Sequence, residues 1–380
     1  MTERPKLIHE FRSYMDYWLN DMFKPDQQGL YPEMSNDNVP NEKGILGSMY
    51  LSRILFGACQ ADRYFATDRY RSLADTALDK LLEFKNPAGG YYWARTYNME
   101  WVHDADNVNM AQAFVLYGLA SYVQLYASEK AAYLYSEQLD FILQDLKDGT
   151  SASFLDGFDE NWMPREVMTR SFGTHFHIME ALVMGYRYRP DERVRKAIEE
   201  LLFLITDRFI DKKKPICLHR FSSDWKVLPN ENWAGHNAEC SWVMVHAARE
   251  IDHIELVEKT EYLSVRMMEN VINEASDPAN GGYFNLVPED GNFENSKSWW
   301  PQAEIVLGLL NAFRITGNAK YQQLAKVQIE FISKYFVESS GEWYSEIDHQ
   351  GRPLSGSPKI FFWKSLYHTV RYYNFLLTQT

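Results

Sequence analysis

The stretch THFHIMEALVMGYRYR, residues 174–189, is mostly apolar and carries two histidines near its start. Similar stretches recur along the chain, and the six begin at Ser48, Met110, Thr174, Ala238, Gln302 and Ser365. Successive starts are 62, 64, 64, 64 and 63 residues apart. A constant period of this kind is typical of a repeat architecture, in which each repeat is one structural unit and neighbouring units bury a common core.

More amphipathic stretches alternate with the apolar ones. They cover residues 7–22, 70–84, 128–147, 193–209, 256–274 and 321–336. In RVRKAIEELLFLITDRF, residues 193–209, the apolar positions follow helical spacing and charge lies on the opposite face. Alternation of this kind predicts two concentric rings, with the apolar helices inside. We therefore predict an all-α fold, an (α/α)6 barrel that forms a single catalytic domain over residues 1–380. Six units suffice to close a ring, which disfavours an open helical solenoid.

Segments rich in glycine and aromatic residues precede the apolar stretches. They are GLYPE at Gly29, GGYYW at Gly89, FLDGFDENW at Phe154, GGYFN at Gly281 and GEWYSEID at Gly341, with a looser form, HRFSSDWKVL, at His219. Glycine permits tight turns, and alternating aromatic residues favour strands. These segments predict short β-hairpins in the rim loops above the starts of the inner helices, where function is expected.

Composition narrows the classes of function. The 39 basic and 52 acidic residues give a net charge of −13, which disfavours nucleic acid and anionic membranes as partners. The three cysteines are far apart, as is typical of a reducing compartment. The N-terminal residues show no apolar signal core, and no apolar run approaches the roughly 18 residues of a membrane span. We expect a cytoplasmic protein, monomeric or homodimeric, that binds a small molecule.

Histidines and acids cluster near the starts of the apolar stretches. His175 and His177 begin the third stretch, His368 lies in the sixth, and His236 and Glu239 precede and begin the fourth. Equivalent parallel helices would bring these starts to one end of the barrel. His236 and Glu239 share a helix face, so Glu239 could orient the imidazole. Neutral imidazoles can take and return a proton near neutral pH, and helix N-termini favour an anion such as an enediolate.

Other interpretations of these residues remain open. A His/Glu collection could hold zinc, but no compact metal motif is present, so we predict neither a metal nor another cofactor. The loop acids Asp104, Asp106, Asp159 and Glu160 could serve a glycoside hydrolase or lyase. Aromatic residues make up 15% of the chain, which suits either a sugar pocket or a large helical core. The remaining histidines, interpreted as structural or surface residues, are His9, His103, His219, His246, His253 and His349.

Several segments resemble the N-acylglucosamine 2-epimerase superfamily, in particular its cellobiose 2-epimerase and mannose 2-epimerase branches. They are QAFVLYGLASY at Gln112, THFHIMEA at Thr174, GHNAECSW at Gly235, WWPQAE at Trp299 and FFWKSLYH at Phe361. The resemblance covers nearly the whole chain. It implies an (α/α)6 barrel and the interconversion of sugars at C2 without a cofactor, through ring opening and an enediolate.

The resemblance also implies roles for individual residues. His368 and His236 are expected to be the acid/base pair, with His177 a third catalytic histidine and Glu239 supporting His236. The residues expected to bind the sugar are Arg53, Trp299, Trp300, Glu304 and Trp363, and we add His175 because it lies beside His177.

Some positions depart from the disaccharide-specific members of this superfamily. Met110 and Gly173 lie where those members tend to have Tyr and Asn, Ser365 and Leu366 replace a Cys-Pro pair, and Thr369 replaces an Asn. These departures favour a monosaccharide, so we predict a 2-epimerase of D-mannose and D-glucose. The alternatives are an aldose–ketose isomerase converting mannose to fructose, a cellobiose 2-epimerase, and a sugar-binding protein without turnover.

Overall fold

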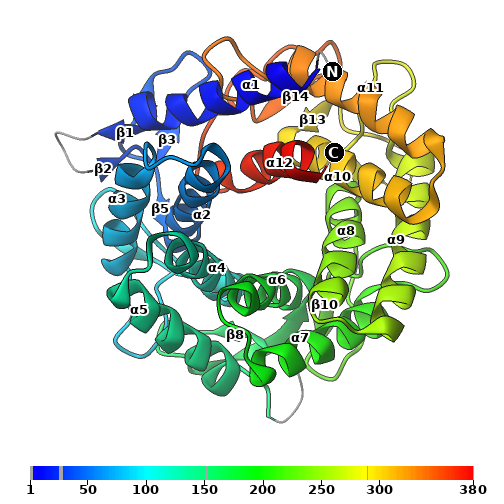
Figure 1. Ribbon diagram of the computed structural model, residues 1–380. Helices are drawn as coiled ribbons and strands as arrows, with labels where there is room; N and C mark the ends of the chain where they lie inside the picture. Colours follow the sequence, from blue (N-terminus) through cyan, green and yellow to red (C-terminus); the bar gives the residue numbers. More distant parts are fainter. Residues whose placement is uncertain (1–2, 25–28, 150–152, 289, 380) are drawn as a thin grey trace.

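The computed structural model describes residues 3–24, 29–149, 153–288 and 290–379, and within them twelve α-helices form two concentric rings (Figure 1). The inner ring consists of α2 (Ser48–Phe65), α4 (Val108–Tyr126), α6 (Phe172–Tyr188), α8 (Ala234–Glu250), α10 (Trp299–Thr316) and α12 (Leu366–Gln379). The outer ring consists of α1 (Glu3–Tyr17), α3 (Arg71–Leu82), α5 (Glu129–Asp140), α7 (Glu192–Leu204), α9 (Ile254–Ala275) and α11 (Ala319–Tyr335). The predicted (α/α)6 barrel is confirmed, and each inner helix begins within four residues of its predicted start.

Burial explains why the two rings differ in sequence. In α4, residues 111–123 are all buried, because this helix contacts its neighbours in the inner ring on two sides and the outer ring on a third. The outer helix α7 instead buries only one stripe, made of Val194, Ala197, Ile198, Leu201 and Leu202. Its charged residues lie on the opposite face, as the spacing predicted. Three outer helices continue into a π-helical turn: α1 into η1 (Trp18–Met22), α5 into η2 (Phe141–Asp145) and α7 into η3 (Ile205–Phe209).

The helix α12 closes the ring by packing between α2 and α10 (Figure 1). Glycine makes this approach possible, since a Cβ on Gly57 of α2 would lie only 2.3 Å from the Cβ of Leu366 at the start of α12. The helix α1 covers α12 from the outer ring. The ring is therefore closed, and the open solenoid is excluded.

Short antiparallel strands lie at the end of the barrel where the inner helices begin. They are β1 (Phe23–Lys24), β2 (Gly29–Leu30), β3 (Glu33–Met34), β4 (Pro40–Asn41), β5 (Leu46–Gly47), β6 (Ala94–Arg95), β7 (Trp101–Val102), β8 (Asp156–Phe158), β9 (Pro164–Ser171), β10 (Arg220–Ser222), β11 (Asn232–Trp233), β12 (Leu286–Val287), β13 (Ser296–Ser298) and β14 (Glu346–Asp348). They pair as β1–β2, β3–β4, β5–β6–β7, β8–β9–β10, β11–β12 and β13–β14. Four strands run directly into inner helices: β5 into α2, β9 into α6, β11 into α8 and β13 into α10. The strands thus form a rim around the positive ends of the inner helices, as predicted.

Among the described helices, none combines the length and the apolar character that crossing a membrane requires.

Candidate active site

A cavity of about 890 Å³ opens at the rim, where the inner helices begin. Its wall contains residues from the first two turns of every inner helix, so six separate stretches of sequence converge on it. The residues from these turns are Arg53, Met110, Gly173, Thr174, His177, His236, Glu239, Trp299, Trp300 and His368. Rim loops and strands complete the wall with Asp106, Asn107, Thr169, Ser171, His219, Arg220, Trp233, Ser298, Ser345, Glu346, Gly356, Ser357, Pro358, Phe361 and Trp363.

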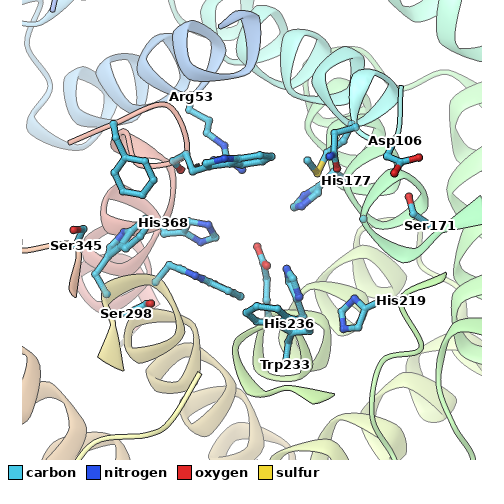
Figure 2. A pocket seen from close by; sticks show the side chains of 18 of the residues that line it. Arg53, Asp106, Ser171, His177, His219, Trp233, His236, Ser298, Ser345 and His368 are labelled. Carbon is cyan, nitrogen blue, oxygen red and sulfur yellow. Dashed lines mark hydrogen bonds between the residues drawn. The ribbon is translucent and has the colours of Figure 1, made fainter. Parts of the chain in front are cut away.

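Three imidazoles face the cavity from different inner helices. Figure 2 shows His177 of α6, His236 of α8 and His368 of α12 pointing toward one another. The indole of Trp300 lies between two of them, with its centroid 4.9 Å from the His236 ring and 5.3 Å from the His368 ring. Sequence analysis predicted this convergence, because all three histidines lie at the same end of repeated helices.

The imidazole of His368 is held by a carboxylate. Its Nδ1 lies 2.7 Å from Oε1 of Glu304, whose Oε2 accepts a hydrogen bond of 2.9 Å from Nε1 of Trp242. Burial lowers the pKa of His368 well below its ordinary value, and burial raises the pKa of Glu304 while Arg371 opposes that rise. The pair can therefore keep a proton between Nδ1 and the carboxylate, which leaves Nε2 of His368 to face the cavity.

One arginine lies beneath the three histidines and binds three carboxylates. Nη1 of Arg371 donates to Glu180, and Nη2 donates to both Glu239 and Glu304. The hydroxyl of Tyr367 also donates to Glu180 and to Glu239. These contacts define a buried cluster, which we call the arginine cluster: Arg371, Tyr367, Glu180, Glu239 and Glu304.

The arginine cluster also contacts His177. Nδ1 of His177 lies 3.2 Å from Oε2 of Glu180, and the imidazole packs 4.7 Å from the ring of Phe114. Burial alone would raise the pKa of Glu180, but Arg371, His177 and Tyr367 together lower it to about 2. The carboxylate is therefore ionised, and it orients the imidazole through Nδ1. Both His177 and His368 are thus linked through carboxylates to the same guanidinium.

The guanidinium of Arg53 lies between the cavity and this cluster. It stacks on Phe114 at 4.1 Å and on Tyr367 at 5.2 Å, while Nη1 donates to the carbonyl oxygen of Trp363 at 2.9 Å. Burial lowers the pKa of Arg53 to about 10, so it stays charged at neutral pH. Its Nε is buried without a hydrogen-bond partner among the described residues, and a bound ligand oxygen could satisfy it.

His236 differs from the other two histidines. Its Nδ1 is buried and has no hydrogen-bond partner within the described part of the chain. Burial lowers the pKa of His236 well below its ordinary value, and His219, His177 and His368 lower it further. Glu239, predicted to support this imidazole, is instead held by Arg371 and Tyr367. The shared helix face was inferred correctly, but the buried arginine competes for the carboxylate, and sequence spacing does not reveal that competition.

His175 does not line the cavity, which corrects its prediction as a sugar-binding residue. Its Nδ1 lies 2.7 Å from the carbonyl oxygen of Ser171, and its Nε2 accepts from the backbone N–H of Phe154 at 3.0 Å. The same position is used in other repeats to tie the preceding hairpin to the inner helix: Gln112 accepts from Tyr91, Asn237 from Cys217, and Gln302 from Tyr283, at 2.7 to 3.1 Å. His175 is therefore part of a structural contact repeated four times. Aligning the repeats by sequence could have indicated this role, because His175 occupies the position of Gln112, Asn237 and Gln302.

Two further placements differ from the sequence interpretation. Glu304 is fully buried and lies behind His368 rather than in the cavity wall, so it acts on the imidazole and does not touch a ligand. His219, interpreted as structural or surface, lines the cavity beside His236 with a centroid separation of 4.9 Å. His219 lies in the rim segment with the weakest repeat pattern, so its place in the repeat did not indicate that it would line the cavity.

Aromatic side chains supply much of the remaining wall. Trp299 and Trp300 begin α10, and Trp363 precedes α12 with its ring centroid 5.6 Å from that of Trp93, tilted by 58°. Trp299 is almost fully buried, whereas 40% of Trp363 is exposed at the mouth. Faces of this kind suit the C–H faces of a sugar, with polar groups placed between them.

Two groups of side chains have metal-ligand geometry. They are His177 with Glu180 and Glu239, and Glu239 with Glu304 and His368. The carboxylates of both groups belong to the arginine cluster and already bind the guanidinium of Arg371. The guanidinium supplies positive charge and hydrogen-bond donors to these carboxylates, so the donor set is fitted to an arginine.

Three of the four acids considered for a hydrolase lie outside the cavity wall. Asp104 accepts the backbone N–H groups of Asp106 and Asn107, and Asp159 accepts those of Asn161 and Met163. They shape turns, and neither lines the cavity. Glu160 is exposed and also lies outside the cavity wall. Asp106 does line the cavity, where it lies 3.3 Å from Arg220.

The fold and this site define a class of protein: an (α/α)6 barrel whose rim holds a histidine-lined, aromatic cavity. The N-acylglucosamine 2-epimerase (GlcNAc 2-epimerase) family matches residues 29–371. The chain belongs to this family, and it is an isomerase, an epimerase of carbohydrates. It is 29% identical to a cellobiose 2-epimerase of Dictyoglomus turgidum over 318 residues, 81% of this chain and 78% of the relative.

Solved structures show the same fold. A cellobiose 2-epimerase from Bacillus thermoamylovorans superposes with a TM-score of 0.91 at 21% identity, over 100% of both chains. A D-mannose isomerase superposes with a TM-score of 0.87 at 17% identity, over 99% of this chain and 98% of the other. At these identities the likeness is one of fold.

Proposed function

We propose that the protein interconverts aldoses at C2, with D-mannose and D-glucose as its substrate pair, and that it needs no cofactor. The observation that carries the proposal is the placement of His236 and His368 in one cavity, on either side of the Trp300 indole. Two bases on different sides of one carbon can remove a proton from one face and deliver a proton to the other.

The reaction begins with the open-chain sugar in the cavity. One histidine takes the C2 proton at Nε2, and the electron pair moves toward C1 and its oxygen to form an enediolate. The C2–C3 bond then rotates, and the other histidine delivers a proton to the opposite face of C2. His177 is placed to exchange protons with the sugar hydroxyls during ring opening.

Charge in the cavity floor favours the enediolate and the proton transfers. Arg53 and the N-termini of the inner helices supply positive charge to the enediolate oxygens. When His368 delivers its Nε2 proton, a proton held by Glu304 can move to Nδ1, and the reverse transfer accompanies proton removal. The His368–Glu304 pair thus exchanges one proton with the sugar without leaving a bare imidazolide.

Cavity size supports a second substrate. A volume of about 890 Å³ lies near the top of the range for small-molecule sites, roughly 300–1,000 Å³. A β-1,4-linked disaccharide such as cellobiose is therefore the second candidate, in line with the names of the relatives. Two of the departures from the disaccharide-specific pattern, Met110 and Gly173, are in the cavity wall, which supports the monosaccharide as the first candidate.

A D-mannose isomerase shares the fold, which keeps the ketose product as the alternative reaction. The same enediolate gives fructose if it is protonated at C1 rather than C2. The test is to incubate the purified protein with D-mannose in D2O with EDTA and to identify products by NMR. Glucose with deuterium at C2 supports the proposal, and fructose as the first product replaces it with the isomerase. If the protein converts cellobiose but not mannose, the disaccharide replaces mannose as the proposed substrate.

A further inference from the structure

His219 and His236 form a pair of adjacent imidazoles in the cavity wall (Figure 2). Their ring centroids are 4.9 Å apart, and the ring planes are tilted by 51°. Nε2 of His219 and Nδ1 of His236 are both buried, and each is without a hydrogen-bond partner in the described ranges. A buried polar atom without a partner is costly, and one bridging water between two neighbouring rings can satisfy both.

Three histidines at the starts of inner helices have a partner at Nδ1. His177 has Glu180, His368 has Glu304, and His175 has the carbonyl oxygen of Ser171. An imidazole that acts as a base through Nε2 must keep its proton on Nδ1, and a hydrogen-bond acceptor there selects that tautomer. His236 needs the same selection, and Glu239 is unavailable because Arg371 and Tyr367 bind it.

The backbone fixes His219 in place. Its N–H donates to Oδ1 of Asn230 at 2.6 Å, and its carbonyl oxygen accepts from the N–H of Phe172, the first residue of α6, at 2.9 Å. The edge of its ring packs on Phe172 at 5.6 Å. The imidazole is therefore positioned between α6 and α8 before any sugar binds, as a positioning group must be.

We propose that His219 is a positioning residue, whose Nε2 accepts a hydrogen bond from Nδ1–H of His236 through one bridging water and so keeps Nε2 of His236 free to act as a base. When His236 takes the C2 proton of the sugar at Nε2, it becomes the imidazolium, and its Nδ1 proton stays in the hydrogen bond. When His236 delivers a proton from Nε2, it returns to the neutral form with the same tautomer.

This inference rests on the proposed epimerase function, and it predicts an asymmetry between the two epimers. One epimer presents its C2 hydrogen to His236 and the other to His368. In D2O the enediolate can regain a deuteron from the histidine that removed the proton, which gives exchange, or from the opposite histidine, which gives epimerisation. Weakening His236 alone changes the ratio of exchange to epimerisation in opposite directions for the two epimers.

The experiment compares His219→Phe with His219→Gln. Phenylalanine keeps a ring of similar size but has no acceptor, whereas the glutamine amide oxygen can accept the Nδ1 proton. We expect His219→Phe to lower kcat by roughly 10- to 100-fold, with the exchange ratio rising for one epimer and falling for the other. The His219→Gln variant should recover most of the rate and the original ratios. His175→Gln, a histidine substitution outside the cavity wall, serves as the control and should leave both ratios unaltered.

Several results would overturn the inference. If His219→Phe slows both epimers but leaves both ratios unchanged, or raises KM alone, then His219 has only a structural or sugar-contacting role. If His219→Phe does not give the native circular dichroism spectrum, His219→Leu replaces it in the comparison with His219→Gln. Equal exchange ratios in these two variants would also show that His219 has only a structural or sugar-contacting role. The unsubstituted protein separates this from the proposed function: absence of C2 exchange with mannose, glucose and cellobiose refutes the epimerase, whereas normal exchange with unchanged ratios refutes only the role of His219.

Discussion

The cavity has two walls that carry the same side chain in different surroundings. On the α12 side, His368 contacts the carboxylate of Glu304, which in turn binds Arg371. On the α8 side, Nδ1 of His236 has no charged partner among the residues that the structure describes, and the neighbouring rings are those of Trp300 and His219. A carboxylate stabilises an imidazolium far better than neutral rings do. Histidines from equivalent helices therefore become unequal bases, and the residues behind them decide which is stronger.

Removal of either imidazole should have the largest effect. His236→Ala and His368→Ala should each lower epimerisation by roughly 10³-fold or more, since each deletes one of two required proton-transfer groups. In D2O, each variant should still exchange the C2 proton of the one epimer that faces the remaining histidine. The measurement is NMR of both sugars with each variant, alongside circular dichroism. Retained epimerisation in either variant would show that the two walls do not share the reaction.

Loss of Arg371 should destabilise the protein more than any surface substitution. Arg371→Met leaves three buried carboxylates without their cation, and breaking a buried ion pair in this way costs about 3–5 kcal/mol. The measurement is the free energy of unfolding in urea. Arg187→Met, which breaks a partly exposed pair with Glu250, is the control and should cost less than about 1 kcal/mol. Equal losses of unfolding free energy in the two variants would mean that the ion pairs of the arginine cluster do not stabilise the fold more than a surface ion pair does.

Glu304→Gln should weaken only the α12 wall. The amide keeps the size of the side chain but cannot stabilise a proton on His368, so kcat should fall by roughly 10²-fold. The exchange ratios should shift in the direction opposite to that seen with His219→Phe for each epimer. The comparison uses the same D2O assay, and a shift in the same direction would show that the two walls are not independent.

His175→Gln should have the smallest effect on turnover. Glutamine makes the same contacts at Gln112 and Gln302, so activity should remain within about twofold, whereas His177→Gln should lower it by roughly 10²-fold. Near-equal losses in the two variants would contradict the structural role given to His175.

The His175→Gln variant should also alter how the free energy of unfolding depends on pH. Burial lowers the pKa of His175 to about 4, so the folded protein holds this imidazole neutral while the unfolded chain protonates it below about pH 6.5. Stability therefore falls as the pH drops from about 6.5 to 4, because the unfolded state binds the extra proton. The His175→Gln variant should lose up to about 3 kcal/mol less over this range in urea titrations.

Much of the fold could be predicted because the signal is repeated. The apolar stretches at Met110 and Gln302 have similar lengths and each is preceded by a glycine-aromatic segment, so each supports the interpretation of the other. The rim hairpins followed from glycine and aromatic residues, and the shared location of His177, His236 and His368 followed from the repeat.

Contacts between repeats were harder to predict. Arg371 lies in the last helix, yet its partners come from α6, α8 and α10, and nothing in local spacing indicates which buried acids an arginine will bind. Glu239 was assigned to His236 because both are on one helix face, but the stronger charge partner lies on another helix. His175 and His177 look alike in sequence, and only the partners of their ring nitrogens distinguish them.

The arginine cluster also has a consequence for the order of assembly. Glu180, Glu239 and Glu304 all precede Arg371 in the sequence, so during synthesis the three carboxylates exist before the cation that neutralises them. A ring of helices that lacks α12 would bring three like charges together in a desolvated core, which disfavours premature compaction. Docking of α12 delivers Tyr367, His368 and Arg371 at once. Closure of the barrel and completion of the proposed catalytic site are therefore a single event.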